Sequence, residues 1–531
     1  MSVAHDTEYN HAFYMNFYMW DMCKDYISRA PCRAGCHSTL LMVFLFLRLF
    51  FCNFAAKYVS FMKQFLFFLL VALVSHATMA QSFDDFFNDS TLRLDYVFAG
   101  NNHEQQIFFE KACVTPRWAG RKGRLADVPL KGNGQLTVKD HETGQPLYVH
   151  TFSTLFQEWQ ATEEATQVNR AFETSYNVPM PKRQVDITVT LTDFHGKVVA
   201  SMTHTVDPTD ILIRRVGSNG VPFYYVWKGQ TLSVEEKNAD SPGHRNFTPS
   251  EETIGGEPDI TSCIDLAIVA EGYTHAQMGK FYNDCQRAVD ALFAHEPFKS
   301  LKNRFNVVAV AAESLDGGPS VPHLGRWRNT AVSTNYDTFY SDRYLTTRDI
   351  HHLYDLLACV PFEHIIVLVN SDTYGGGGIY NQVMVTTSDH PTFAQVLVHE
   401  FGHSYAGLGD EYFYDDAYES MYPADTEPWE PNLTTLVDFQ SKWADMLPKG
   451  TAIPTPPDPK VPNYRKITNE KEQRMLDAAT QRVGVFEGGG YQSKGVYRPA
   501  QECRMKINEV TNFCPVCSRA IQRITDFYTS H

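Results

Sequence analysis

The chain has 531 residues, a formal net charge of -15, 43% hydrophobic residues and 20% charged residues. This length and composition are typical of a globular protein with two or more domains, and they exclude a fibrous or largely disordered chain. The acidic balance also argues against nucleic acid as a partner, because phosphate binding requires a basic face.

The first 80 residues contain a predicted export signal. Residues 62–80 combine a lysine near their start, an apolar run at 65–74 and small residues before Gln81. This arrangement is typical of a secretory signal peptide, here cleaved after Ala80. We therefore expect residues 62–80 to be a signal peptide and residues 1–61 to be a mis-called upstream extension.

No membrane span is expected in the mature chain. The apolar runs at 40–51 and 65–74 are both shorter than the ~20 residues that a spanning helix needs, and Arg48 interrupts the first. We expect an exported protein that is secreted, periplasmic or held at the cell surface.

Residues 81–235 are predicted to form an N-terminal β domain. Apolar and polar residues alternate there, and Gly, Asn and Asp turns separate the alternating runs, which include 92–98, 135–138 and 185–191. This pattern predicts an antiparallel β-sandwich-like domain. The polar residues 236–258, which are rich in Gly and Pro, are predicted to be a linker.

A different pattern begins at residue 259 and continues to residue 531. Apolar strand patterns alternate with amphipathic helical patterns, with strands expected at 264–270, 305–310 and 365–369 and helices at 275–293 and 347–357. Such alternation predicts an α/β layer with a largely parallel sheet. Together with the preceding β domain, it predicts an α+β multidomain fold.

Four consecutive glycines at 375–378 precede an alternating run at 382–386. We do not expect a phosphate-binding loop, because no Lys-Ser/Thr pair follows the glycines. We expect a flexible loop that leads into an edge strand at 382–386. An extended peptide can add to such an edge as a further strand.

The most informative motif is H-E-x-x-H, formed by His399, Glu400 and His403. Residues four apart lie on the same face of a helix, so the two imidazoles can bind one metal ion. Glu400 can then reach a water molecule at the metal without taking a ligand position, as in zinc hydrolases. Pro391 is expected to open this helix and Gly407 to end it.

A catalytic zinc ion usually has three protein ligands, so a third must follow the helix. The candidates are Asp410, Glu411 and, less favoured, Tyr412. In the pattern H-E-x-x-H-x-x-G-x-x-H the third ligand lies three residues beyond the glycine, and Asp410 has this distance from Gly407. We expect Asp410 to be the ligand, with Glu411 as the alternative. Either acid can instead orient a histidine without touching the metal.

Residues 399–412, HEFGHSYAGLGDEY, resemble the signature of the IgA-peptidase family of secreted bacterial zinc metallopeptidases, which are metzincin-like. Further similar segments are 427–434, 442–443, 486–491, 497–499 and 503–505. The resemblance covers residues 259–531 closely and the N-terminal β domain more loosely. It implies Zn²⁺, peptide-bond hydrolysis and export, but it does not imply that immunoglobulin A is the substrate.

The resemblance suggests a role for Met505, and the sequence itself suggests roles for other residues, including two tyrosines close to Met505 in the chain. Met505 is the candidate for the methionine turn that such enzymes place beneath the metal, with an ordinary core methionine as the alternative. Tyr491 or Tyr497 is a candidate hydrogen-bond donor to the oxyanion. The acidic residues of 415–419 are expected to form an exposed loop, with calcium binding as the alternative.

Seven cysteines follow residue 80, and export favours disulfide bonds among them. We expect a disulfide from Cys503 to either Cys514 or Cys517, because no histidine lies near these three cysteines in the sequence. A second zinc site and a redox pair remain the alternatives.

Two functions from different classes fit these features. The first is a secreted zinc endopeptidase that cleaves extracellular proteins or peptides, with His399, His403 and Asp410 holding Zn²⁺ and Glu400 acting as general base. The second is an exported glycan- or protein-binding surface protein with an inert or structural metal site. The presence of Glu400 favours the enzyme, because a structural site does not need a base.

Overall fold

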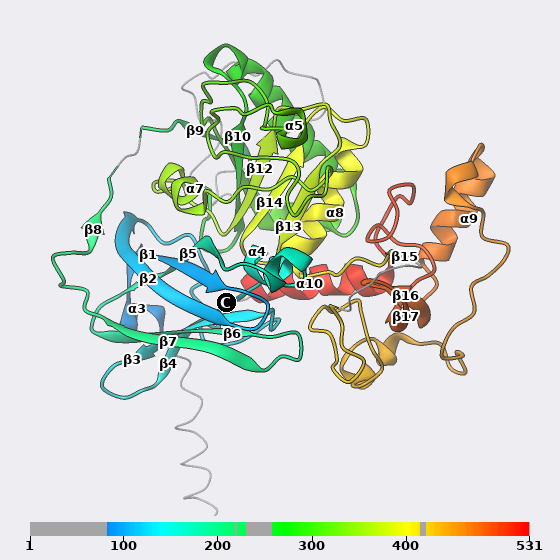
Figure 1. Cartoon of the computed structure of the whole chain (residues 1–531), viewed down its shortest axis with the longest axis horizontal. Helices are drawn as coiled ribbons and strands as arrows, with labels where there is room; N and C mark the ends of the chain where they lie inside the picture. Colours follow the sequence, from blue (N-terminus) through cyan, green and yellow to red (C-terminus); the bar gives the residue numbers. More distant parts are fainter. Residues whose placement is uncertain (1–81, 218–219, 230–257, 415–420, 530–531) are drawn as a thin grey trace, which may run out of the picture. The chain divides into compact units, whose positions relative to one another are not determined.

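The computed structural model describes residues 82–217, 220–229, 258–414 and 421–529, and Figure 1 shows their helices and strands. The predicted extension and signal peptide, nearly all of the predicted linker and the acidic loop at 415–419 lie outside these residues. Within the described parts of the chain, no helix is both long enough and apolar enough to cross a membrane.

Two four-stranded sheets form the N-terminal part of the described chain, with the orders β5-β1-β2-β8 and β4-β3-β6-β7. Every pair is antiparallel except the short β2–β8 pair. The strands are β1 (Phe87–Gly100), β2 (Gln105–Pro116), β3 (Gly134–Asp140), β4 (Pro146–Phe152), β5 (Arg170–Pro181), β6 (Val185–Thr192), β7 (Val198–Val206) and β8 (Arg214–Arg215). The predicted antiparallel β domain is confirmed, and the three alternating runs lie in β1, β3 and β6.

A six-stranded sheet forms the centre of the second part, in the order β13-β14-β12-β10-β11-β9. The four inner strands are parallel to one another, and the two outer strands are antiparallel to their neighbours. The strands are β9 (Phe223–Trp227), β10 (Ile264–Glu271), β11 (Phe305–Val310), β12 (His364–Val369), β13 (Gly376–Ile379) and β14 (Val383–Thr387). The predicted α/β layer with a largely parallel sheet is therefore confirmed.

The remaining elements are helices and a small C-terminal sheet with the order β15-β17-β16. Its strands are β15 (Phe413–Tyr414), β16 (Phe486–Gly489) and β17 (Tyr491–Arg498). The helices are α3 (Phe83–Phe86), α4 (Leu155–Gln160), α5 (Met278–Ala294), α6 (Phe298–Leu301), α7 (Ile350–Leu356), α8 (Phe393–Ala406), α9 (Glu470–Thr480) and α10 (Pro515–Thr529).

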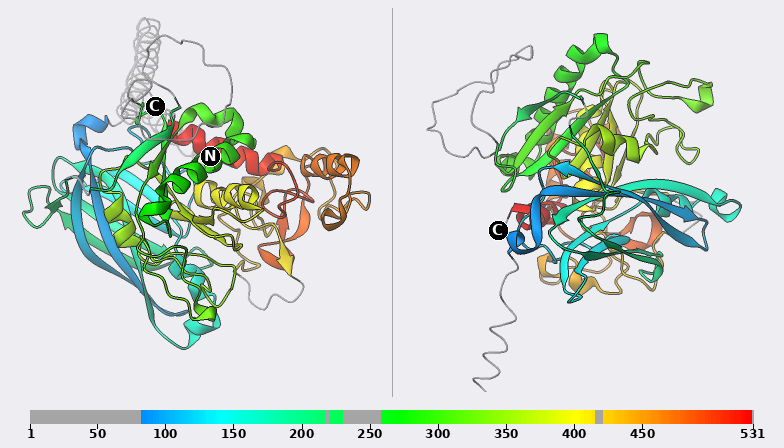
Figure 2. Two further views of the ribbon diagram at one scale, coloured as in Figure 1. Left: turned by 90° about the horizontal axis from the view of Figure 1, so that it is seen from above. Right: turned by 90° about the vertical axis from the view of Figure 1, so that its left-hand side faces the viewer.

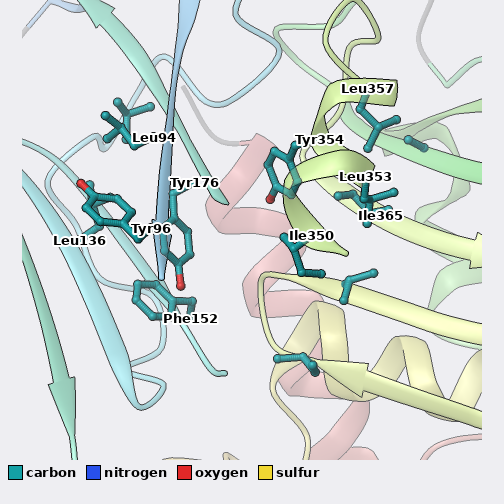
Figure 3. Packing of buried hydrophobic residues seen from close by; sticks show 14 of the residues in the cluster. Leu94, Tyr96, Leu136, Phe152, Tyr176, Ile350, Leu353, Tyr354, Leu357 and Ile365 are labelled. Carbon is teal, nitrogen blue, oxygen red and sulfur yellow. The ribbon is translucent and has the colours of Figure 1, made fainter. Parts of the chain in front are cut away.

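The two faces of the six-stranded sheet are covered by different elements. In β10, Leu266 and Ile268 belong to the buried cluster that includes residues of α5, α8 and α10, whereas Ala267 and Val269 belong to a second cluster. This second cluster joins the sheet to α7 and to both N-terminal sheets (Figure 3), and Figure 2 shows the ribbons of these parts from two further sides. Figure 3 shows its N-terminal members on one side, including Tyr96, Phe152 and Tyr176, and on the other side Ile350, Leu353 and Tyr354 of α7. The N-terminal β domain, together with α7, therefore covers one face of the six-stranded sheet, and α8 lies on the other.

Strand β9 connects the two parts in a second way. It lies inside the stretch predicted as the N-terminal β domain (81–235), yet it pairs with β11 at one edge of the six-stranded sheet. The described residues from 82 onward form one compact unit, consistent with this shared sheet and shared core.

Two predictions around α8 are wrong in detail. The run at 382–386 is not an edge strand, because β14 lies between β12 and β13. The glycines form the edge strand β13 instead, since their lack of side chains lets this strand lie close to α8. Pro391 also precedes the helix, which begins at Phe393 after Thr392.

Candidate metal centre

Helix α8 presents two histidines from adjacent turns. His399 and His403 lie four residues apart on one helix face, and their Nε2 atoms are 3.0 Å apart. The helix ends, as predicted, at Gly407, whose φ of 59° is in the left-handed region that favours glycine. The N–H of Leu408 then donates to the carbonyl of Gly402, so the chain turns back toward the histidines.

The turn after α8 brings Asp410 to the two histidines. Its Oδ1 atom lies 3.1 Å from His399 Nε2 and 3.3 Å from His403 Nε2. Asn432 holds this turn in place, because its side chain accepts from the N–H of Gly409 at 2.7 Å and donates to the carbonyl of Gly409 at 2.9 Å. The structure therefore brings together the three residues that the sequence predicts as metal ligands.

The other two candidates point elsewhere. Glu411 is fully buried, and its Oε1 accepts from Asn432 at 3.0 Å and from the thiol of Cys517 at 3.1 Å. The ring of Tyr412 packs edge-on against the ring of Tyr491, with 5.3 Å between centroids. This geometry favours Asp410 over Glu411 as the third ligand.

The two imidazoles are oriented as metal ligands. His399 Nδ1 lies 3.0 Å from the carbonyl oxygen of Arg504, and His403 Nδ1 lies 2.5 Å from that of Leu408. A carbonyl only accepts, so each Nδ1 carries the proton and each Nε2 of a neutral imidazole presents a lone pair. Two such lone pairs and a carboxylate oxygen at these distances repel one another unless a cation lies between them. Two imidazoles and one carboxylate are a donor set that fits zinc.

A proton and a metal ion compete for the Nε2 lone pair of a ligand histidine, and either one supplies positive charge next to Asp410. Burial lowers the pKa of His403, but the charge of Asp410 and the hydrogen bond to it outweigh burial and raise the pKa to about 9. Burial acts to raise the pKa of Asp410, but the two imidazoles hold it well below its ordinary value. The side chains of His399, His403 and Asp410 are 14%, 15% and 7% exposed, so the centre is not sealed from solvent.

Glu400 lies between the first histidine and the glycine strand β13. A Cβ atom on Gly376 would lie 2.9 Å from Glu400 Oε1, and one on Gly378 would lie 2.3 Å from the Glu400 carbonyl oxygen. Only glycine at these positions allows the strand to pass this close to α8. Burial raises the pKa of Glu400, and the charge of Asp410 adds to this effect while the two histidines oppose it. A raised pKa suits a carboxylate that accepts and returns a proton.

Met505 lies directly against α8 at Gly402. Its side chain is fully buried, and a Cβ atom on Gly402 would lie 2.8 Å from its sulfur. Glycine in a helix is ~1 kcal/mol less favourable than alanine, and this contact explains its presence. The Met505 carbonyl accepts from the N–H of Glu411 at 2.8 Å, and the preceding carbonyl of Arg504 accepts from His399. This position fits both a methionine turn and the alternative of a core methionine, since Met505 also belongs to the buried cluster around α8.

Tyr491 has a different position from the one expected of an oxyanion donor. Its hydroxyl donates to Asp410 Oδ2 at 2.5 Å, while Oδ1 of the same carboxylate faces the histidines. Tyr491 thus fixes the orientation of Asp410. Tyr497 lies farther along the same strand, and its backbone pairs with Thr434.

The N-terminal domain also contributes a residue near this centre, which no sequence motif predicted. Glu158 of α4 accepts a hydrogen bond from the hydroxyl of Tyr344, and its charge interacts with His403, Asp410 and Glu400. Burial raises the pKa of Glu158 to about 7. No local motif marks this residue, because it approaches α8 only through the packing of two distant parts of the chain.

The comparisons with known proteins agree with the fold. Residues 254–478 and 457–525 match the family model described as IgA Peptidase M64, and residues 82–203 match the model described as Peptidase M64 N-terminus. No curated protein matches the chain. The first family model spans more than half of the chain and includes α8, the turn with Asp410 and the Met505 segment. The chain therefore belongs to the M64 peptidases, a family of metallopeptidases.

Proposed function

We propose that this protein is an exported, zinc-dependent endopeptidase that hydrolyses peptide bonds of extracellular proteins. The observation that carries the proposal is the convergence of His399 Nε2, His403 Nε2 and Asp410 Oδ1, with Glu400 on the same helix. Membership of a peptidase family supports the reaction class. Export rests on the signal-peptide pattern of residues 62–80.

His399, His403 and Asp410 would hold the zinc ion. When bound, zinc supplies a Lewis acid that polarises a carbonyl and lowers the pKa of water to about 7. The carbonyls of Arg504 and Leu408 keep both imidazoles in the ligand tautomer, and the hydroxyl of Tyr491 keeps Asp410 directed at them. These contacts fix the ligands before any substrate arrives.

Glu400 acts as the general base. Its position directly after His399 on α8 keeps the carboxylate next to the centre but outside the group of three ligand atoms. Its pKa, raised by burial, suits a residue that takes a proton from the attacking water and then delivers it to the leaving amine.

The edge strand β13 is the proposed guide for the substrate backbone, in place of the run at 382–386. It forms one end of the six-stranded sheet, and its glycines lie against Glu400 and His403. The outer edge of β13 carries one bridge, between Gly376 and Tyr344, and beyond it Gly377 and Gly378 present no side chain to a peptide. Main-chain hydrogen bonds at such an edge recognise extended peptides with little dependence on sequence.

A digest of a broad peptide library by the zinc-loaded protein tests the proposal. We expect internal peptide bonds to be cleaved, and we expect no cleavage by the His403→Ala variant. Bound zinc at this centre without cleavage of any peptide would instead support the exported glycan- or protein-binding protein. The same digest reports the side-chain preference of the enzyme.

A further inference from the structure

A second group of ligand-type side chains lies beneath the catalytic centre. It consists of Glu411, Cys503, Cys514 and Cys517, and their ligand atoms all lie within 4.8 Å of one another. All four residues are 0% exposed. The group shares no residue with the catalytic ligands, although Glu411 is the chain neighbour of Asp410.

Three separate segments supply these four residues. Glu411 comes from the turn after α8, and Cys503 precedes Met505 by two residues. Cys514 immediately precedes α10, and Cys517 lies in the first turn of that helix. The spacing Cys-x-x-Cys is a common source of two metal ligands, because it places both sulfurs on the same side of a tight turn.

The distances do not fit the disulfide expected from the sequence. Cys503, Cys514 and Cys517 form no disulfide, and the Sγ atoms of Cys503 and Cys517 are 3.8 Å apart. A disulfide requires about 2.05 Å between its sulfurs. In a tetrahedral site with Zn–S bonds of about 2.3 Å, by contrast, neighbouring sulfurs lie about 3.8 Å apart.

Neighbouring N–H groups and a guanidinium can stabilise negative charge on the thiolates of this group. The N–H of Cys514 points to Cys503 Sγ at 3.3 Å, and the N–H of Cys517 points to Cys514 Sγ at 3.5 Å. The buried guanidinium of Arg498 lies near enough to attract Glu411 and Cys503. Oε2 of Glu411 is buried and has no hydrogen-bond partner within the described residues. Burial of a carboxylate oxygen without a hydrogen bond is energetically costly, so a cation next to this oxygen would stabilise it.

We propose that Glu411, Cys503, Cys514 and Cys517 bind a second zinc ion, which has a structural role. Three sulfurs and one carboxylate form a closed, four-coordinate donor set that suits zinc and not the oxygen-seeking ions Mg²⁺ and Ca²⁺. Binding releases the thiol protons to solvent. The ion would connect three segments: the turn that carries Asp410, the Met505 segment and the start of α10. It would thereby hold these segments in place against α8.

The test uses the full chain with the catalytic centre disabled by the double substitution His399→Ala and His403→Ala. We expect this variant to retain one zinc per chain, against two in the wild type. X-ray absorption at the zinc edge should show three sulfur neighbours at about 2.3 Å. Replacement by Co²⁺ should give a sulfur-to-cobalt charge-transfer band. A double variant without zinc, or with zinc bound only by nitrogen and oxygen, would overturn the proposal.

A disulfide gives a different and equally clear result. The denatured, metal-free protein is alkylated without reductant, and the peptides that contain the three cysteines are weighed. We expect Cys503, Cys514 and Cys517 all to be alkylated, whereas a Cys503–Cys517 bond would leave two of them unmodified and would rule out the site. Because both measurements are independent of peptide cleavage, failure of the proposed peptidase activity does not affect them.

Single substitutions identify the ligands within the double variant. Cys517→Ser should lose the remaining zinc, and Cys285→Ser is the matched control because Cys285 is equally buried but lies on α5, outside the group. If Cys517→Ser fails to fold, the cobalt spectrum and the absorption data of the double variant still decide the question. Retention of zinc by a folded Cys517→Ser variant would contradict the assignment of this ligand.

Discussion

Asp410 and Glu411 are neighbours in the chain, yet they belong to two centres of different character. Asp410 joins two imidazoles at a centre whose side chains remain 7–15% exposed, whereas Glu411 joins three cysteines in a group that is fully buried. A catalytic zinc site needs an open position for water and substrate, and a structural site is closed by four protein ligands. The two proposed roles therefore differ in exposure as well as in donor type, imidazole against thiol, although each centre includes one carboxylate.

The two centres share their supports. Asn432 donates to the carbonyl of Gly409 and to Glu411, so one amide holds the turn on both sides of Asp410. The Met505 carbonyl accepts from the N–H of Glu411, and the carbonyl next to it accepts from His399. A disturbance of the buried centre should therefore reach the open one, whereas the loss of catalytic zinc should leave the buried centre intact.

The largest expected effect that separates the centres comes from Glu400→Gln. We expect kcat to fall by about 10²–10⁴-fold, because the proton acceptor is lost. Zinc content should not change, since Glu400 belongs to neither ligand group. Peptide-cleavage kinetics together with metal analysis check both statements. Retained turnover would show that Glu400 is not the general base. The control is Glu470→Gln, a substitution at an exposed position of α9.

Tyr491→Phe should weaken the open centre alone. Without its hydroxyl, Asp410 Oδ2 loses the donor that orients the carboxylate, and we expect zinc affinity there to fall by about 10–100-fold. Competition with a chelator measures this affinity, while the cysteine-bound zinc should resist the same chelator concentration. Tyr497→Phe is the control on the same strand. Equal behaviour of the two variants would show that the hydroxyl of Tyr491 does not support the metal.

Glu158→Gln tests the contact between the N-terminal domain and the open centre through pH. Burial raises the pKa of this carboxyl to about 7, so the folded state binds its proton more tightly than the unfolded state does. The free energy of unfolding should therefore decrease as pH rises from about 4.5 to about 7, by about 2 kcal/mol from this group.

Urea unfolding at pH 5 and pH 7 should show a smaller decrease in Glu158→Gln than in the wild type. The exposed Glu142→Gln, in the turn between β3 and β4, provides the comparison. An unchanged pH dependence in Glu158→Gln would mean that this carboxyl ionises as it does in water.

The smallest expected effect concerns the packing that lies between the two centres. Gly402→Ala places a methyl group 2.8 Å from the sulfur of Met505, and we expect it to destabilise the fold by about 1 kcal/mol, because overpacking outweighs the gain in helix propensity. Gly279→Ala in α5 meets no atom within 4 Å and should stabilise the fold by a similar amount. Thermal unfolding of both variants measures the direction of each stability change. A stabilised Gly402→Ala variant would show that the Met505 side chain moves aside at little cost.

The elements with strong local sequence patterns could be predicted from the sequence alone. Buried strands such as β10 and the helix with His399 and His403 follow from periodicity and spacing, and the glycine turn directed attention to Asp410. The spacing of Cys503, Cys514 and Cys517 left a second zinc site open as an alternative. The approach of Glu411 to these cysteines, and of Glu158 to the other centre, depends on contacts between distant segments, for which a single sequence gives no signal. Residues 375–378 were predicted as a loop because glycine is rare in strands. The close approach of β13 to Glu400 explains why this strand contains glycines.

Strand β9 has a consequence for how this protein can be divided. It lies between the stretches matched by the two family models, 82–203 and 254–525, but it completes the sheet of the peptidase part. A chain cut at the start of the second match would leave β11 with a bare edge, and such edges promote aggregation. The boundaries of the family matches therefore differ from the boundary of the folded sheet. A fragment of the peptidase part that includes β9 should be more soluble than one that begins at residue 254.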